Sequence, residues 1–479
     1  LRGATGGVLA GLAPASGGPL LMLSALALLW SVADQRRAAG LWGFLAVLVS
    51  HRWLLGLHPL TWMGVPALLS LPVAISLLVL CATAAALLLL LWSVLARRLN
   101  PGGGSSWPPA AVLLLALVWA GVELALEGSP LFWIGVGGSV LPFDRPLAGL
   151  ARWVGSGGLA LVQLVWGWAL WQIWCQRGRR LRLWLSTFVL AHAVGALLLI
   201  PPASVGELQI GVWQTAIPTR EKFNAERQKR LNPSLLQALD EAKTLGAELL
   251  VAPEGTLPSQ WRPPASGLSL PLISGGFRWV RGEQRSSLLL GVPDRQSLQP
   301  LVDKHRLVPI GEWLPPLPAG ARVGLSAVGG VQPGTASRLI DGLSPPAAAV
   351  ICYEVSDGRA QAAATVHGAE WLLAVANLDP YPLLLQRQFL ALAQLRAIET
   401  GRDLLSAANT GPTALITANG TVQAHVATID SLTFGNVSAS GTDAAIAESF
   451  GDFNVIGMNV LARLGSWRVE DNTLILVPR

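Results

Sequence analysis

Charged residues are scarce in this sequence. Only 13% of its 479 residues are Asp, Glu, Lys or Arg, 52% are hydrophobic, and the mean hydropathy is +0.50. This hydropathy is too high for an ordinary soluble protein. The 20 tryptophans suit the aromatic belts at membrane interfaces. The composition therefore predicts a membrane protein that also has a sizeable polar part.

Cysteine is scarce as well. Cys81 and Cys175 lie in apolar runs, so Cys352 has no local disulfide partner in the polar half. The six histidines are scattered without ligand spacing, and no glycine motif for cradling phosphate is present, so we expect neither a metal nor a cofactor. The net charge of +6 comes from arginines between apolar runs, which argues against nucleic-acid binding.

Long apolar runs fill residues 1–202 and predict a multi-span α-helical membrane domain. We expect about seven segments, at residues 6–13, 19–33, 38–55, 68–96, 109–126, 154–175 and 183–200. A spanning helix needs about 20 apolar residues, and the fourth and sixth segments reach that length alone. The chain begins inside an apolar stretch without an initiator Met, so we expect the first segment to be truncated or re-entrant.

Arginine clusters determine the expected orientation. They lie at residues 36–37, 97–98 and 177–182, after the second, fourth and sixth segments. Loops rich in Lys and Arg stay in the cytoplasm. The seventh segment should then run outward, which makes the chain a multi-pass protein of a bacterial plasma (inner) membrane with its polar half in the periplasm.

Two features near the outer ends of these segments are candidates for function. Glu123 is an intramembrane carboxylate, which is either functional or solvated at the interface. The aromatic loop at residues 128–133 either contacts lipid or anchors a helix.

The polar half alternates strand-like and helix-like patterns, which predicts an α/β domain. Strands are expected at residues 208–215, 248–252, 286–292, 347–353, 371–376, 404–407 and 414–417. Helical spacing of apolar residues marks 223–245 and 383–400.

Cys352 follows the apolar run 347–351 directly. A nucleophile at the carboxyl end of a strand is typical of α/β enzymes, because connecting loops form a crevice there. A thiol in this position needs a base and a positive charge to react. The alternative is a buried structural thiol, which is the usual state of a free cysteine.

Glu254 and Lys304 offer the base and the charge. Each lies at or just after an apolar strand, in a turn that contains Pro or Gly. Glu254 can accept the thiol proton, and Lys304 can lower the pKa of the thiol and stabilise an oxyanion. The alternative for both is an ordinary solvated charge on the surface.

The order Glu254, Lys304, Cys352 resembles the Glu-Lys-Cys triad of the nitrilase (carbon–nitrogen hydrolase) superfamily. Four stretches carry the resemblance: APEG (252–255), DKHRLVPIGEWLP (303–315), ICYE (351–354) and residues 394–411. Several membrane spans followed by such a domain resemble the bacterial apolipoprotein N-acyltransferases. The resemblance implies an αββα sandwich over residues 203–467, after the membrane domain at 1–202 and before a short polar tail at 468–479.

The resemblance also implies a reaction and further residues. A phospholipid would donate an acyl chain to Cys352, and the N-terminal amine of an S-diacylglyceryl-cysteine apolipoprotein would accept it at the bilayer. By the resemblance, Glu312 supports the base region, while Tyr353 and Glu354 shape the site beside the nucleophile. His305 and Arg306 are interpreted as structural or headgroup contacts.

The sequence departs from the family pattern in three places. Phe223 stands where the family has a Trp. The segment 377–382 keeps Asn377 but lacks the aromatic pair expected after it. The tail after Trp467 is too polar for the additional spanning helix that relatives have. The first two changes bear on substrate contacts rather than on the triad.

Two other functions fit the same residues. A membrane-tethered amidase or nitrilase would use the same thioester chemistry on a small C–N substrate. A degenerate relative would only bind lipoproteins, and its Cys352 would be unreactive.

Overall fold

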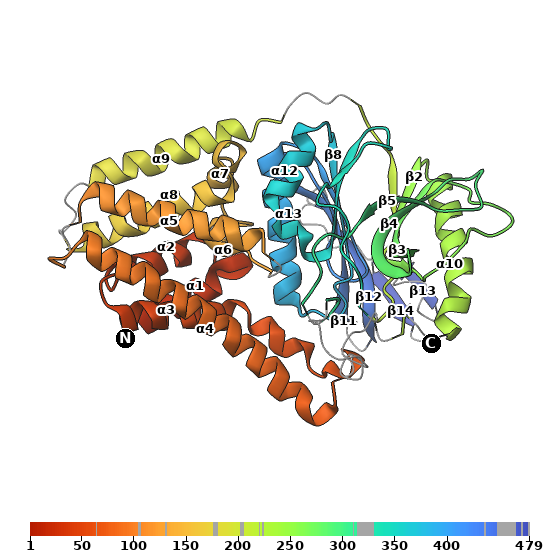
Figure 1. Ribbon diagram of the computed structural model, residues 1–479. Coiled ribbons are helices and arrows are strands. Elements are labelled where there is room, and N and C mark those ends of the chain that lie inside the picture. The colour runs from red at the N-terminus through yellow and green to blue at the C-terminus, as the bar shows by residue number, and fades with distance from the viewer. Residues whose placement is uncertain are drawn as a thin grey trace.

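The computed structural model of the chain describes residues 1–63, 65–103, 107–129, 132–175, 181–201, 206–219, 221–222, 225–309, 311–313, 330–434, 437–447, 466–470 and 473–477. The molecule consists of a bundle of long helices and an α/β body beside it (Figure 1). The chain completes the bundle before it enters the α/β body.

Six helices among the described residues are long and apolar enough to cross a membrane: Arg2–Trp30, Arg36–Leu57, Ala67–Leu99, Pro109–Glu127, Ala151–Cys175 and Leu181–Leu198. The expected seven segments differ from this count because the first two belong to the single stretch Arg2–Trp30. Pro14 and Ala15 leave helical geometry and divide that stretch into α1 (Arg2–Leu12), η1 (Ala13–Gly17) and α2 (Gly18–Trp30). The two halves pack against each other.

Glycines allow the first helices to approach closely. α1 packs against α3 (Arg36–Ser50), and a Cβ atom added to Gly3 would lie 2.3 Å from the Ala38 carbonyl oxygen. The same addition at Gly7 would meet the Trp42 carbonyl oxygen at 2.4 Å. Small residues at a spacing of four are the usual way in which membrane helices bring their backbones together.

The rest of the bundle comprises η2 (Arg52–Leu57), η3 (Leu60–Met63), α4 (Ala67–Leu99), α5 (Pro109–Glu127), α6 (Gly135–Gly138), α7 (Arg145–Ala148), α8 (Ala151–Cys175) and α9 (Leu181–Leu198). The long helices of this set are rich in apolar residues, and many of their large apolar side chains are exposed on the outside of the bundle. This pattern is expected where lipid rather than water surrounds a helix.

The α/β body contains two sheets. The first has the order β1-β2-β3-β4-β5, and the second has the order β12-β11-β10-β9-β8-β7-β6. The strands of the first are Ile210–Val212, Leu249–Leu257, Leu272–Val280, Glu283–Gly291 and Gln299–Asp303. Those of the second are, from β6 to β12, Leu339–Ile340, Ala347–Ile351, Trp371–Ala376, Leu404–Ala408, Thr413–Ile416, Val422–Phe434 and Val437–Ala447.

The two sheets face each other through contacts of β2 with β8 and β9. α10 (Ala225–Thr244) covers the outer face of the first sheet, and α12 (Gly358–Val366) and α13 (Leu383–Thr400) cover the second (Figure 1). α13 packs on α8 as well, so it lies between the body and the bundle. The predicted fold class, a multi-span membrane domain with an αββα sandwich, is confirmed.

The core of the α/β body lies around the three parallel strands of the second sheet. Every residue of β7 is buried, and β7, β8 and β9 run parallel. Such strands read as continuous apolar runs because both of their faces are covered.

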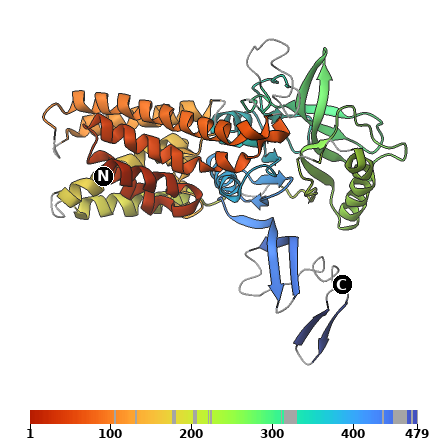
Figure 2. The same ribbon diagram turned by 90° about the horizontal axis from the view of Figure 1, so that it is seen from below.

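The last strands extend away from the body. Figure 2 shows β11 and β12 as a long ribbon, with the hairpin of β13 (Ser466–Glu470) and β14 (Thr473–Val477) beyond it. The expected polar tail at 468–479 therefore contains most of this hairpin.

Candidate active site

The thiol lies on a sharp turn from a strand to a helix. Cys352 follows β7 and begins the short 3-10 helix η4 (Cys352–Ser356). Its φ is +58°, a left-handed conformation that costs a non-glycine residue about 1–2 kcal/mol. Strain of this kind persists where the surroundings impose it, and it often marks a functional turn. The turn brings the thiol to the carboxyl edge of the parallel strands.

A buried lysine joins two carboxylates beside this turn. Lys304 follows β5 directly, and its Nζ donates to Glu254 Oε1 and to Glu312 Oε1, both at 2.8 Å. The Lys304 side chain is 1% exposed. These three residues form the Glu254–Lys304–Glu312 cluster, and an ammonium group held by two carboxylates keeps one N–H for another acceptor.

Strand irregularity and a backbone donor orient Glu254. The pairing of β2 with β3 shifts register between Ala252 and Leu257, on either side of Glu254. Such bulges re-aim side chains next to active sites. The second carboxylate oxygen, Oε2, accepts from the backbone N–H of Asn377 at 3.0 Å. Both oxygens are thus held, one by Lys304 and one by the end of β8.

Burial and the nearby carboxylates favour the protonated form of the Cys352 thiol. Burial and the nearby Glu254 raise the pKa of Cys352 well above its usual value, and Lys304 offsets only part of this. Burial opposes the charge of Lys304, but Glu254 and Glu312 raise its pKa well above the usual range. The charge of Lys304 opposes this rise in the pKa of the thiol, but burial and the two carboxylates outweigh it. A reacting thiol here has to give its proton to a base as it attacks.

Glu354 links the turn of the thiol to the turn of the lysine. Its Oε1 accepts from the backbone N–H groups of His305 at 2.7 Å and Arg306 at 2.9 Å. Its Oε2 accepts from the N–H of Ile351 at 2.8 Å, and Arg338 pairs with it at 3.2 Å. This buried carboxylate therefore fixes Cys352 and Lys304 relative to each other.

Tyr353 packs beside the lysine. Its hydroxyl donates to the carbonyl oxygen of Leu307, and the Lys304 Nζ lies 5.8 Å from the centre of its ring. Glu312 is held in turn by the N–H of Val308, which donates to Oε2 at 2.9 Å. The structure thus brings Glu312, Tyr353 and Glu354 close to Lys304 and Cys352.

Asn377 contributes its side chain as well as its N–H. Its Nδ2 donates to Thr219 Oγ1 at 2.9 Å, and its Oδ1 accepts from Asn409 Nδ2 at 2.9 Å. Asp379 then accepts from the N–H of Thr219 at 2.7 Å. These bonds tie the loop after β1 to the ends of β8 and β9. Phe223 lies outside the described residues.

An aromatic wall from the bundle reaches the site. The Trp53 ring lies 6.0 Å from that of Tyr381 and 6.2 Å from that of Phe132, and Phe132 stacks on Phe389 at 5.1 Å. Tyr381 interacts electrostatically with Cys352, and burial raises its pKa well above the usual value. Aromatic residues from loops of the bundle therefore pack into the same apolar cluster as Cys352.

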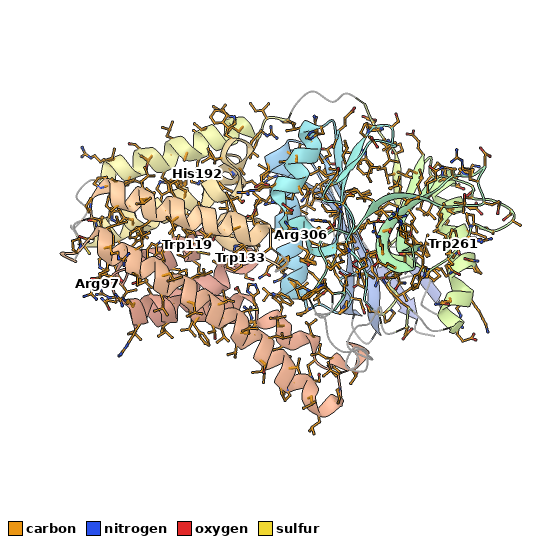
Figure 3. All side chains as sticks on the ribbon, in the orientation of Figure 1. Arg97, Trp119, Trp133, His192, Trp261 and Arg306 are labelled. Carbon is orange, nitrogen blue, oxygen red and sulfur yellow. The ribbon has the colours of Figure 1, made fainter. Side chains whose placement is uncertain are left out.

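An apolar cavity of about 350 Å³ lies within the bundle, between α3, α4 and α5. Glu123 borders it and accepts from the Trp119 Nε1 at 2.9 Å and the Val136 N–H at 2.7 Å. Figure 3 labels Trp119 and Trp133 on the bundle, and both line the cavity. Glu123 is therefore an anchor between α5 and α6 rather than a solvated interfacial group.

Curated relatives share most of this chain. An apolipoprotein N-acyltransferase of Parasynechococcus marenigrum is 67% identical over 423 residues, which cover 88% of this chain and 91% of the relative. Another from Prochlorococcus marinus (strain MIT 9313) is 56% identical and covers 88% of this chain and 87% of its own. The chain belongs to the apolipoprotein N-acyltransferase family.

Membership makes the chain an N-acyltransferase of lipoprotein maturation. Solved structures and a family model also match parts of the chain. Saccharomyces cerevisiae Nit3, a nitrilase-superfamily member, is 13% identical with a TM-score of 0.35 and covers 52% of this chain and 96% of its own. An amidase from Nesterenkonia sp. is 16% identical, with a TM-score of 0.32, and covers 51% and 90%. A family model described as gag-polyprotein putative aspartyl protease matches residues 397–463, far less than half of the chain.

Two residues of this acyltransferase that sequence reasoning missed lie beside the cluster. Lys222 Nζ donates to the backbone carbonyl oxygen of Glu254 at 3.0 Å, and burial lowers its pKa to about 8. Arg338 is 2% exposed and pairs with Glu354. Lys222 directly precedes Phe223, the position at which the family has a Trp. This adjacency in the sequence could have pointed to Lys222.

Arg306 is a structural contact between the two parts of the acyltransferase. It pairs with Asp357 and donates to the carbonyl oxygens of Glu127 and Ser129 at the end of α5. Figure 3 shows it where the bundle meets the body. Of the two interpretations from sequence, the structural one fits these contacts.

Proposed function

We propose that Cys352 carries the acyl chain as a thioester, with Glu254 as the general base and Lys304 as the stabiliser of the oxyanion. The donor is a membrane phospholipid, and the acceptor is the α-amine of an S-diacylglyceryl cysteine at the N-terminus of an apolipoprotein. The observation that carries the proposal is the buried Glu254–Lys304–Glu312 cluster beside a thiol on a strained strand-end turn.

In the first step the sulfur of Cys352 attacks the ester carbonyl carbon of the phospholipid. The thiol proton passes to Glu254, since the raised pKa of Cys352 disfavours a preformed thiolate. Lys304 stabilises the tetrahedral oxyanion with its remaining N–H. The C–O bond then breaks, the leaving alkoxide takes the proton from Glu254, and a lysophospholipid departs.

In the second step the neutral α-amine attacks the thioester carbonyl carbon. Glu254 takes a proton from the attacking nitrogen, and the C–S bond breaks as the amide forms. The thiolate of Cys352 is reprotonated from Glu254, which restores the resting state. Dividing the transfer into two steps replaces one difficult displacement with two easier ones.

The position of the site suits two lipid substrates. The aromatic wall of Trp53 and Phe132 comes from the bundle, so the approach to Cys352 borders the membrane domain. Confinement at the bilayer raises the chance that ester, thiol and amine meet in a reactive orientation. The arginines at residues 36–37 and 97–98 support an orientation with the α/β body in the periplasm.

The test follows the acyl chain by mass spectrometry. The protein is reconstituted in phospholipid vesicles and incubated with a diacylglyceryl-cysteine lipopeptide. We expect the lipopeptide amine to gain one acyl chain, and without lipopeptide we expect Cys352 to gain the same mass in a form cleaved by hydroxylamine. Cys352→Ala should lower the rate by about 10⁴-fold or more.

Cys175→Ala is the matched control, because Cys175 is an exposed thiol at the end of α8. This variant should keep the full rate. Acyl transfer by Cys352→Ala at the rate of the parent would refute the thioester. Hydrolysis of soluble amides without any acylation of the lipopeptide would favour an amidase instead.

A further inference from the structure

A polar pocket lies at the end of the bundle opposite the α/β body. It has a volume of about 930 Å³ and lies between the start of α3 and the end of α4. Arg36, Arg37 and Arg97 line it, and Figure 3 shows Arg97 at this far end. Asp34 lines it too, but the three arginines outweigh its charge. The pocket is therefore suited to an anion.

The helix that begins in this pocket adds backbone donors. α3 is 15 residues long and starts at Arg36, and the side chain of its N-cap residue, Gln35, makes no capping hydrogen bond. The first N–H groups of a helix have no partner within the helix, and the helix dipole favours negative charge there. Phosphate groups bind at such helix starts for both reasons.

A buried amide in the pocket wall is without a partner. Asn100 caps the end of α4 and is only 7% exposed, and its Nδ2 makes no hydrogen bond. An unsatisfied buried donor costs free energy, so such groups in folded proteins usually have a protein, water or ligand partner. The Nδ2 atom has almost no accessible surface, so a rotation of the Asn100 side chain would bring this donor to an anionic oxygen in the pocket.

The pocket lies at the ends of two candidate membrane spans. The candidate span Arg36–Leu57 begins at it, and the candidate span Ala67–Leu99 ends at it. A cluster of tryptophans lies near this end of the bundle, with the Trp30 ring 5.3 Å from that of Trp107 and 5.4 Å from that of Trp92. Tryptophans gather where the hydrocarbon meets the headgroups.

We infer that this pocket binds the phosphate group of an anionic phospholipid in the leaflet farther from the active site. The arginines supply charge, the first turn of α3 supplies backbone N–H groups, and Asn100 supplies an amide N–H. Basic pockets between membrane helices bind anionic headgroups in this way. The bound lipid would tie α3 to α4 and would take no part in the acyl transfer.

The test measures binding in nanodiscs that contain the full chain. One set contains phosphatidylcholine alone, and the other contains a fixed fraction of phosphatidylglycerol. We expect phosphatidylglycerol to raise the unfolding temperature, and native mass spectrometry should show a retained phosphatidylglycerol but no retained phosphatidylcholine. Arg97→Gln should weaken this binding about fivefold, the usual effect of one arginine near an anionic surface.

Arg98→Gln is the matched control. Arg98 lies in the same last turn of α4 and carries the same charge, but it does not line the pocket. It should leave the binding almost unchanged, whereas Asn100→Leu should weaken it. Equal losses in Arg97→Gln and Arg98→Gln would refute a built site and leave a diffuse surface charge.

Two further measurements distinguish a lipid site from a site for a soluble anion and from a failure of the variants to fold. Inorganic phosphate added to the protein in detergent should not raise the unfolding temperature, and a rise equal to that with phosphatidylglycerol would assign the site to a soluble anion. If the variants do not fold, the wild-type comparison of the two lipids still decides, because equal retention of both would overturn the inference. Acyl transfer should be the same for Arg97→Gln and the parent.

Discussion

The molecule contains two buried clusters with the same composition, one cation between two carboxylates. In the first, Lys304 lies between Glu254 and Glu312, at 2.8 Å from each. In the second, Arg396 lies 3.1 Å from Glu399 and 3.8 Å from Glu127. Both cations are almost fully buried, so neither burial nor charge alone distinguishes the cluster that we propose to be catalytic.

The surroundings of the two clusters differ. The first borders a thiol in a strained conformation, and its carboxylate Glu254 is held at a strand end. The second lies between α5, α8 and α13, where Ser156 donates its N–H to Glu399 at 2.8 Å and Arg396 donates to the carbonyl oxygen of Ser356 at 3.2 Å. The second therefore joins the bundle to the body, whereas the first lies beside the thiol for which we propose a catalytic role.

We expect a substitution in the first cluster to lower the rate of acyl transfer. Glu254→Gln should slow acyl transfer to the lipopeptide by about 10³-fold, because an amide cannot accept the proton of Cys352, and general bases contribute about 10²- to 10⁴-fold. The rate is measured by mass spectrometry with protein matched for folding by its unfolding temperature. Glu283→Gln, at an exposed carboxylate on β4, is the control and should keep the parent rate. A Glu254→Gln rate within tenfold of the parent would exclude Glu254 as the base.

We expect a substitution in the second cluster to lower the stability of the protein. Arg396→Met leaves Glu127 and Glu399 buried without their cation, and breaking a buried pair from one side costs about 3–5 kcal/mol. The unfolding temperature in detergent, followed by tryptophan fluorescence, should fall. The rate of acyl transfer per folded molecule should stay close to that of the parent. An unchanged unfolding temperature with a lost rate would reverse the roles assigned to the two clusters.

The sequence could point to the proposed triad because the signals of its three residues are local. Glu254, Lys304 and Cys352 each lie within or directly after a strand, and apolar runs reveal strand ends without knowledge of the fold. The αββα sandwich came from the family resemblance, since the alternation of strands and helices predicts only an α/β class. The expected elements did not include β3, β5, β6, α12 or the ribbon of β11 and β12.

The second cluster was not predictable, because its partners are far apart in the chain. Glu127 ends an apolar helix and Arg396 lies in the middle of α13, and nothing in either stretch indicates the other. Residues that act through tertiary pairing, such as Arg338 on Glu354, were missed for the same reason. The number of spans differed where Pro14 and Ala15 bend a stretch that length and composition count as one helix.

The smallest expected effect concerns the pH dependence of the second cluster. Burial raises the pKa of Glu399 to about 7 from an ordinary value of 4.5, although Arg396 partly offsets it. Because the folded state holds this proton more tightly than the unfolded state, the free energy of unfolding falls as pH rises from about 4.5 to about 7. The total fall is about 3 kcal/mol, and it is complete above that range.

Glu399→Gln isolates this contribution, because the amide stays uncharged throughout. The unfolding temperature of the variant minus that of the parent should increase between about pH 4.5 and pH 7 and then level off. Glu370→Gln, at an exposed carboxylate, should give a difference that does not change over this range. Parallel curves for Glu399→Gln and the parent would mean that Glu399 keeps an ordinary pKa. In that case the Arg396 cluster would be held by full ionic pairing, and the contrast between the two clusters would rest on their surroundings.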